Sequence, residues 1–138
     1  MINENPERIT ELLATHISNI KASVLAVHPN YEAMFKTGTE YDGSGKVKGY
    51  LSFFPQSDVA KECIDLTLML SNTQRGAVFA AELAWSGGKT IDEIAVCEVC
   101  PDCLDDLCGC IDNLVNRIRE PLVEQMVVLL NNFESRID

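Results

Sequence analysis

The fold is decided by residues 63–85, which read CIDLTLMLSNTQRGAVFAAELAW. In the first half every second residue is a leucine or an isoleucine: Ile64, Leu66, Leu68 and Leu70. After the turn-forming residues Ser71–Gly76, the alternation returns in Ala77, Phe79, Ala81, Leu83 and Trp85, with Glu82 on the opposite side. A period of two places apolar side chains on one face of a strand. We therefore expect two antiparallel strands, each buried on one face only.

Shorter strand and turn signals flank this pair. Upstream, Asp42–Gly45 has the composition of a turn at the tip of a hairpin, and Tyr50–Phe54 is expected to form a strand that the next proline ends. Downstream, Ser86–Lys89 contains two adjacent glycines, which accept the positive φ angles of a tight hairpin turn. A further strand is expected to follow this turn and to extend toward Val99. Together these signals predict a small antiparallel sheet of three to five strands.

Both ends of the chain have helical periodicity. Near the N-terminus, Asn5 can cap a helix whose first turn holds Pro6 and Glu7, and this helix is expected to end at His28, which precedes a proline. Its apolar stripe is Ile9, Leu12, Leu13, His16, Ile17, Ile20, Val24 and Val27. The C-terminal third predicts a longer helix, which Pro121 is expected to kink or divide. The stripe of this second helix is Leu104, Leu107, Cys108, Ile111, Leu114, Val115, Ile118, Leu122, Met126, Leu129, Leu130 and Phe133.

The order of helix, antiparallel sheet and long helix predicts an α+β fold. A length of 138 residues suits a single domain, and no linker or internal repeat divides residues 1–138. Each helix has one apolar stripe, and the central strands have one apolar face. The simplest packing therefore lays both helices on the same face of the sheet, in two layers.

The net charge of −10 narrows the classes of partner. Such a surface repels phosphate groups, which argues against nucleic acid and against an anionic membrane as partners. No apolar run reaches the length of a membrane span. The N-terminal residues lack the basic and apolar segments of a secretory signal. We therefore expect a cytoplasmic protein whose thiols are reduced by default.

The cysteines are the one concentration of chemically versatile side chains. Five of the six lie in one stretch, with the spacing C-x2-C-x2-C-x4-C-x-C. As a metal centre, this stretch would hold zinc or an iron–sulfur cluster. For zinc, however, the last two cysteines follow the first ones too closely in the sequence to form two facing zinc knuckles. A helix that begins near Asp102 would also turn the fourth thiol toward the core. The best ligand set is Cys97, Cys100, Cys103 and Cys108.

Two other interpretations of the cysteines stay open. Cys100 and Cys103 have the C-x-x-C spacing of a redox pair at a helix start, but the neighbouring carboxylates disfavour a thiolate there. The interpretation that we favour is that the thiols are reduced and pack as small apolar side chains. In that case the stretch has no chemistry of its own.

The two histidines limit any catalytic arrangement. His16 lies within the apolar stripe of the first helix, which is typical of a core or interface histidine, and His28 lies at the end of that helix. A Cys–His pair would have to join one of them to a thiol such as Cys63. No nucleophile–base pair or cofactor fingerprint is evident in the sequence, so we do not expect an enzyme.

Our leading interpretation is a small acidic protein that binds a protein partner, as immunity proteins, antitoxins and secretion chaperones do. Its charge would suit a basic partner, and a homodimer is a further expectation. This interpretation predicts an exposed apolar patch on the sheet or the last helix, beside an acidic rim. The alternative is a metal- or iron–sulfur-binding protein that uses the cysteine stretch.

Overall fold

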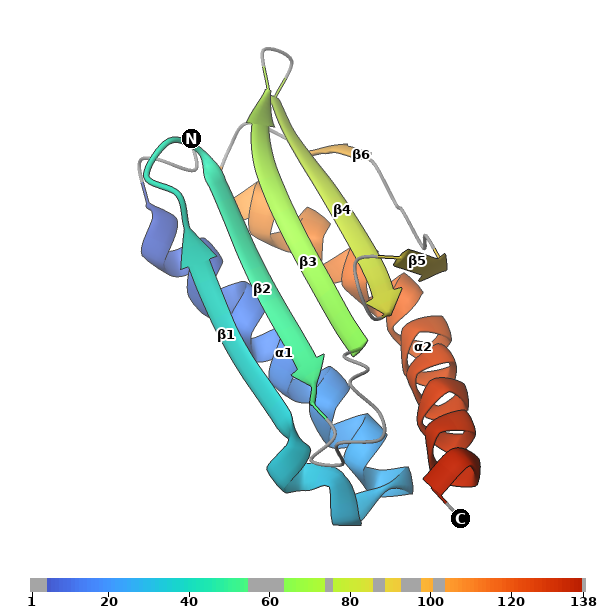
Figure 1. Ribbon diagram of the computed structural model, residues 1–138. Coiled ribbons are helices and arrows are strands. Elements are labelled where there is room, and N and C mark those ends of the chain that lie inside the picture. Colours follow the sequence, from blue (N-terminus) through green and yellow to red (C-terminus); the bar gives the residue numbers. More distant parts are fainter. Residues whose placement is uncertain are drawn as a thin grey trace.

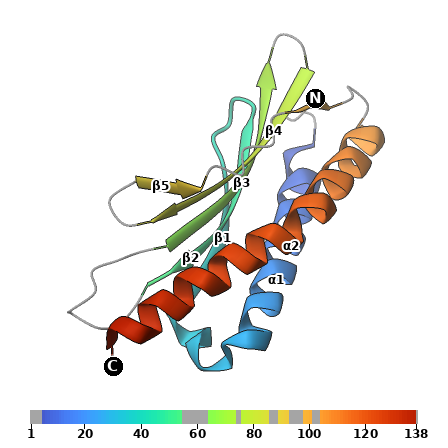
Figure 2. The same cartoon turned by 90° about the vertical axis from the view of Figure 1, so that its right-hand side faces the viewer.

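The computed structural model describes residues 5–54, 64–73, 76–85, 89–92, 98–100 and 104–137. Two long helices lie against one face of a twisted sheet (Figure 1, Figure 2). This arrangement confirms the α+β fold that the sequence predicts. In chain order, the elements are α1 (Pro6–Val27), the 3₁₀ helix η2 (Pro29–Met34), β1 (Phe35–Tyr41), β2 (Lys46–Phe53), β3 (Ile64–Thr73), β4 (Gly76–Trp85), β5 (Lys89–Asp92), β6 (Glu98–Cys100) and α2 (Leu104–Ile137).

The sheet is antiparallel and follows the order of the chain. Its strands lie in the order β1-β2-β3-β4-β5, and β6 also pairs with β4. Four strands are long, which agrees with the expected three to five, and β5 and β6 add two short segments beside β4. The strand expected from Lys89 toward Val99 is therefore found as two short strands. Residues 93–97 between them lie outside the described part.

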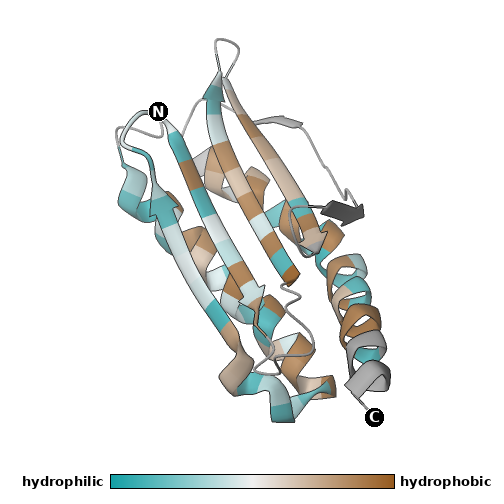
Figure 3. Cartoon of the chain, in the orientation of Figure 1, coloured by the Kyte–Doolittle hydropathy of each residue, from teal (hydrophilic) through white to brown (hydrophobic). Residues whose placement is uncertain are grey.

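The alternation in residues 63–85 determines which face of the sheet is buried. Residues of β3 are alternately buried and half-buried along the strand, and apolar and polar residues alternate visibly along β2 and β3 in Figure 3. Burying one such leucine or phenylalanine contributes roughly 1.5–3 kcal/mol to folding. The residues of β2, β3 and β4 that are buried on the helix side are Val47, Leu51, Phe53, Ile64, Leu66, Leu68, Leu70, Ala77, Phe79, Ala81 and Leu83.

α1 packs closely on β2 because β2 has a glycine where the helix crosses it. Asn5 caps the helix, with its side-chain oxygen 3.4 Å from the backbone N–H of Arg8. A Cβ atom on Gly49 would lie 3.2 Å from side-chain atoms of both Leu13 and Ile17. The missing side chain thus allows the buried stripe of α1 to approach the sheet. Within that stripe, Ile9, Leu13, Ile17, Ile20 and Val24 are almost completely buried.

α2 is one continuous helix that passes through Pro121. The proline does not divide the helix, because buried Ile118 and Leu122 hold the turns on both sides against the core while Pro121 faces solvent. On that side, water can satisfy the carbonyl group that a proline leaves without its usual partner. No helix in the described residues combines the length and apolar character that spanning a membrane requires.

Candidate functional site

The structure locates only part of the cysteine stretch. Cys97 and Cys103 lie outside the described residues, and Cys100 ends β6. Cys108 is buried on α2, which begins at Leu104, close to the predicted start. Within the described residues, no three His, Cys, Asp or Glu side chains come together as metal ligands would. The zinc and iron–sulfur interpretations therefore stay predictions.

His16 joins the two helices. Its Nε2 atom lies 2.6 Å from Oδ1 of Asp112 on α2, and the imidazole is almost fully buried while the carboxylate is half-exposed. The carboxylate can only accept when ionised, so Nε2 carries the proton and donates it. The other ring nitrogen, Nδ1, is buried and has no hydrogen-bond partner among the described residues. His16 is thus an interface histidine, as its position in the apolar stripe indicated, and Asp112 is the partner that the sequence did not reveal.

The second histidine also contacts α2. His28 Nε2 lies 2.8 Å from Oδ1 of Asn131, and the His28 ring stacks on Tyr31 with a centroid separation of 5.3 Å. Both histidines of the chain therefore hold α1 against α2, one near the middle and one at the end of α1. These contacts position the helices, and Cys63, the thiol considered as a catalytic partner, lies outside the described residues.

The opposite face of the sheet has no described helix over it (Figure 2). We call this surface the open face. Across β1 to β4, cross-strand neighbours on it form three four-residue rows and one three-residue row. The rows are Lys36–Ser52–Asp65–Ala84, Gly38–Tyr50–Thr67–Glu82, Glu40–Lys48–Met69–Ala80 and Lys46–Ser71–Val78.

The open face differs from the expected apolar patch in two ways. Most of its uncharged side chains, among them Tyr50, Met69 and Val78, are half-buried rather than fully exposed, and Ser52 is buried. Its charges are mixed rather than acidic, since the three carboxylates are accompanied by three lysines. Glu40 and Lys48 are 3.6 Å apart, a surface ion pair that contributes little to stability. The result is a flat surface of small, aromatic and thioether side chains with a mixed charged rim.

Gly38 and Tyr50 shape this surface beside β1. A Cβ atom on Gly38 would collide with the hydroxyl and ring of Tyr50, so the tyrosine lies flat across the glycine. Glycine usually weakens a strand because it has no side chain to pack. Here the tyrosine ring supplies that packing, and the open face reaches the edge strand without a bulge.

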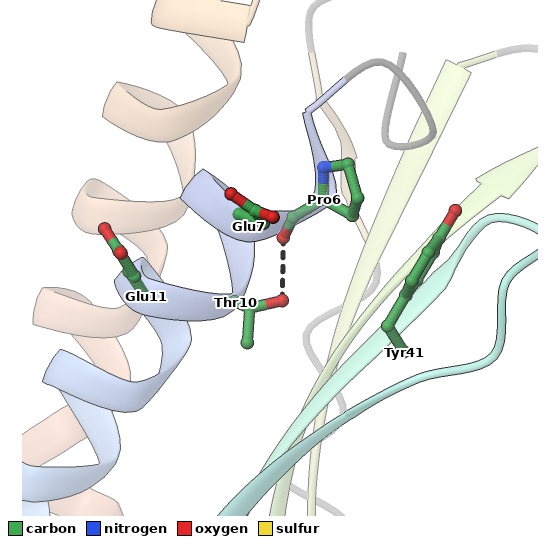
Figure 4. Close-up of a pocket in the computed structure, with 5 residues that line it drawn as sticks. All are labelled: Pro6, Glu7, Thr10, Glu11 and Tyr41. Atoms are coloured by element: carbon green, nitrogen blue, oxygen red, sulfur yellow. Dashed lines mark hydrogen bonds between the residues drawn. The ribbon is translucent and has the colours of Figure 1, made fainter.

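Two hollows meet at Tyr41, at the end of β1. The first, of about 420 Å³, lies between this ring and the start of α1 and is lined by Pro6, Glu7, Thr10 and Glu11; Figure 4 shows Tyr41 across from Pro6 and Thr10. The second, of about 390 Å³, lies on the open-face side and includes Met69. Tyr41 is 38% exposed. A hollow lined by an aromatic ring and two glutamates is a suitable environment for a basic side chain.

Asp42 fixes the turn that positions Tyr41. Its carboxylate accepts hydrogen bonds from the backbone N–H groups of Ser44, Gly45 and Lys46 and from the Ser44 hydroxyl, at 2.8–3.1 Å. The backbone donors, led by Ser44, lower the pKa of Asp42 to about 2. Gly43 and Gly45 adopt φ angles of 79° and 129°, as the predicted hairpin tip requires. Asp42 is therefore a structural residue of the turn.

The arrangement has to be interpreted from its own geometry. Comparison of the chain with protein-family models, curated proteins and solved structures finds no match in any of the three.

Proposed function

We propose that this chain is a non-catalytic, partner-binding protein that holds a protein partner on the open face. One observation supports this proposal most strongly: both described helices lie on the same face of the sheet, and the other face is only half-buried. A two-layer fold needs one buried face for its core. The second face is then available for another molecule.

The composition of the open face suits the centre of a protein interface. Tyr50 and Met69 belong to residue types that are enriched at interfaces, because both combine large contact area with few or adaptable polar groups. Ala80 and Ala84 keep the neighbouring surface flat, so a partner's backbone can approach closely. The mixed rim of lysines and carboxylates can orient the partner without burying a charge.

A basic partner is the better match for the whole molecule. The net charge of −10 attracts cationic surfaces over distances of roughly a Debye length, about 8 Å at physiological salt. The hollow beside Tyr41 adds a local reason, since Glu7 and Glu11 line it and, among the described residues, no lysine or arginine does. A lysine or arginine side chain at the border of the partner would fit this hollow.

Site-specific photo-crosslinking in the source cells tests the proposal. A photoreactive amino acid replaces Ala80 on the open face in one variant, and Val128, which is 50% exposed on α2, in a matched control. We expect a discrete protein adduct from position 80 and none from position 128. The crosslinked protein is identified, purified and shown to bind the unmodified chain. Equal adducts from both positions, or none from position 80, would contradict the proposal.

A further inference from the structure

The exposed edge of β1 has the properties of a self-pairing strand. In the described part of the sheet, β1 pairs on one side only, with β2, and forms the border of the sheet in Figure 1. Its register with β2 runs without interruption from Phe35↔Phe53 to Tyr41↔Val47. The strand contains no proline, and a regular edge of this length is a template for another strand.

Two hydrogen bonds at the ends of β1 show which backbone groups face the edge. The N–H of Phe54 donates to the carbonyl oxygen of Met34 at 2.8 Å. The N–H of Asp42 donates to the carbonyl oxygen of Lys46 at 3.1 Å. In an antiparallel ladder alternate residues bond to the same neighbour, so the even-numbered residues of β1 bond to β2. The odd-numbered residues Thr37, Thr39 and Tyr41 therefore direct their N–H and C=O groups outward. Phe35 directs only its C=O group outward, because its N–H donates to the carbonyl oxygen of Glu32.

We infer that two copies of this chain associate through β1, antiparallel and centred on Gly38. This register pairs Thr37 of each copy with Thr39 of the other and places Lys36 of each copy opposite Glu40 of the other, on the open face. Two opposite-charge pairs thus form around one two-fold axis, at the closely spaced positions of the ladder. The inference goes beyond the proposed function, because it places a second copy at the β1 edge, in addition to the partner on the open face.

Neighbouring registers are less favourable. A shift by two residues in one direction places Lys36 opposite Gly38, so neither Lys36 nor Glu40 faces an opposite charge of the other copy. The opposite shift places Lys36 opposite Asp42, whose carboxylate already accepts the hydrogen bonds of the turn. Charged side chains on an edge strand usually prevent pairing. Here they favour the register in which they complement each other.

Glycine at the centre of the strand suits this geometry. At the two-fold axis, the two Gly38 residues face each other, and no side chain of β1 stands between the strands on the open face. Each Tyr50 ring, which lies across its own Gly38, then reaches the axis. The pairing joins the open faces of both copies into one continuous surface. A single seven-residue strand contact is small for an interface, so we expect a weak dimer.

Charge-swap variants of the full chain test the inference by sedimentation equilibrium at physiological salt. Lys36→Glu places Glu opposite Glu, and Glu40→Lys places Lys opposite Lys, so each single variant should dimerise about tenfold more weakly than the natural chain. An equimolar mixture of the two variants restores both opposite-charge pairs. We expect this mixture to dimerise about as tightly as the natural chain.

Matched controls change the same charge elsewhere. Lys21→Glu on α1 and Glu82→Lys on β4 alter the net charge equally, and we expect both to dimerise as the natural chain does. A natural chain that stays monomeric up to its solubility limit would overturn the inference, as would single variants that dimerise normally or a mixture that does not recover. If photo-crosslinking at position 80 gives no adduct but the chain still dimerises through β1, only the proposal of a partner on the open face is contradicted.

Discussion

Along β4, Phe79 is completely buried on the helix side, whereas the next residue, Ala80, is half-buried on the open face. The same contrast separates Leu66 from Thr67 on β3. The strands therefore bury apolar side chains completely against the helices, whereas most side chains on the other face, including Tyr50 and Met69, are only half-buried. The helix side of the sheet holds the fold together, and the open face can change with little effect on stability. This asymmetry is what a binding surface on a small domain requires.

The largest difference between the faces is expected from truncation of one residue on each. Phe79→Ala removes a fully buried ring and should lower the free energy of unfolding by about 3–5 kcal/mol. Thr67→Ala on the open face should lower it by less than about 1 kcal/mol. Urea denaturation followed by circular dichroism measures both values. Similar losses for the two variants would show that the open face is part of the core.

Two glycine substitutions sharpen the comparison at the helix layer. Gly49→Ala places a methyl group against α1 and should cost about 1–3 kcal/mol, because both neighbouring side chains must move. Gly109→Ala adds a methyl group on α2 with no atom within 4 Å, and should stabilise the helix by about 0.5–1 kcal/mol. Thermal unfolding of the two variants gives the signs. A stabilising Gly49→Ala would contradict the close approach of α1 to β2.

The contact between His16 and Asp112 is expected to matter only when both partners are present. Asp112→Ala leaves the buried Nε2–H of His16 without its acceptor and should cost about 1–2 kcal/mol. In a His16→Leu background the same change should have almost no effect, because the polar group is gone. A double-mutant cycle measures this difference. Equal costs of Asp112→Ala in both backgrounds would rule out the contact.

A smaller, pH-dependent effect is expected at the hairpin tip. The pKa of Asp42 is about 2 in the folded chain, and its ordinary value is about 3.9. The contribution of its ionised carboxylate to the free energy of unfolding is therefore complete above roughly pH 5 and is lost as the pH falls toward 2 and below. Asp42→Ala should therefore unfold at lower denaturant than the natural chain at pH 7. The two should converge as the pH falls below 2. A gap that stays constant over this range would show that the carboxylate does not hold the turn.

The alternation in residues 63–85 was sufficient to predict which described side chains of β3 and β4 are buried, since the period of two is a local property; the side chain of Trp85, expected on the same face, lies outside the described part. The boundaries of α1 at Asn5 and His28 and most of its stripe were predictable for the same reason, but Val27, expected in the stripe, is exposed at the end of the helix. In contrast, the open face depends on how four strands pair and where the helices pack. These are long-range choices that no short pattern in the sequence specifies.

The site was therefore only partly predictable. A histidine within an apolar stripe indicated a buried partner for His16, but nothing local pointed to Asp112, 96 positions away. The hollow beside Tyr41 gave no signal, because its walls come from α1 and the β1–β2 hairpin. The cysteine stretch gave the strongest signal, yet Cys97 and Cys103 lie outside the described residues. Zinc and iron analysis of the anaerobically purified protein would decide that alternative.

The most direct test of the open face compares one substitution at two places. Val78→Lys changes the open face, and Val128→Lys makes the same change on the solvent side of α2, where the valine is 50% exposed. With the crosslinked partner in purified form, we expect calorimetry to show at least about tenfold weaker binding for Val78→Lys, which corresponds to roughly 1.4 kcal/mol. Val128→Lys should bind as the natural chain does. Equal affinities for the two variants would contradict the assignment of the open face as the binding surface.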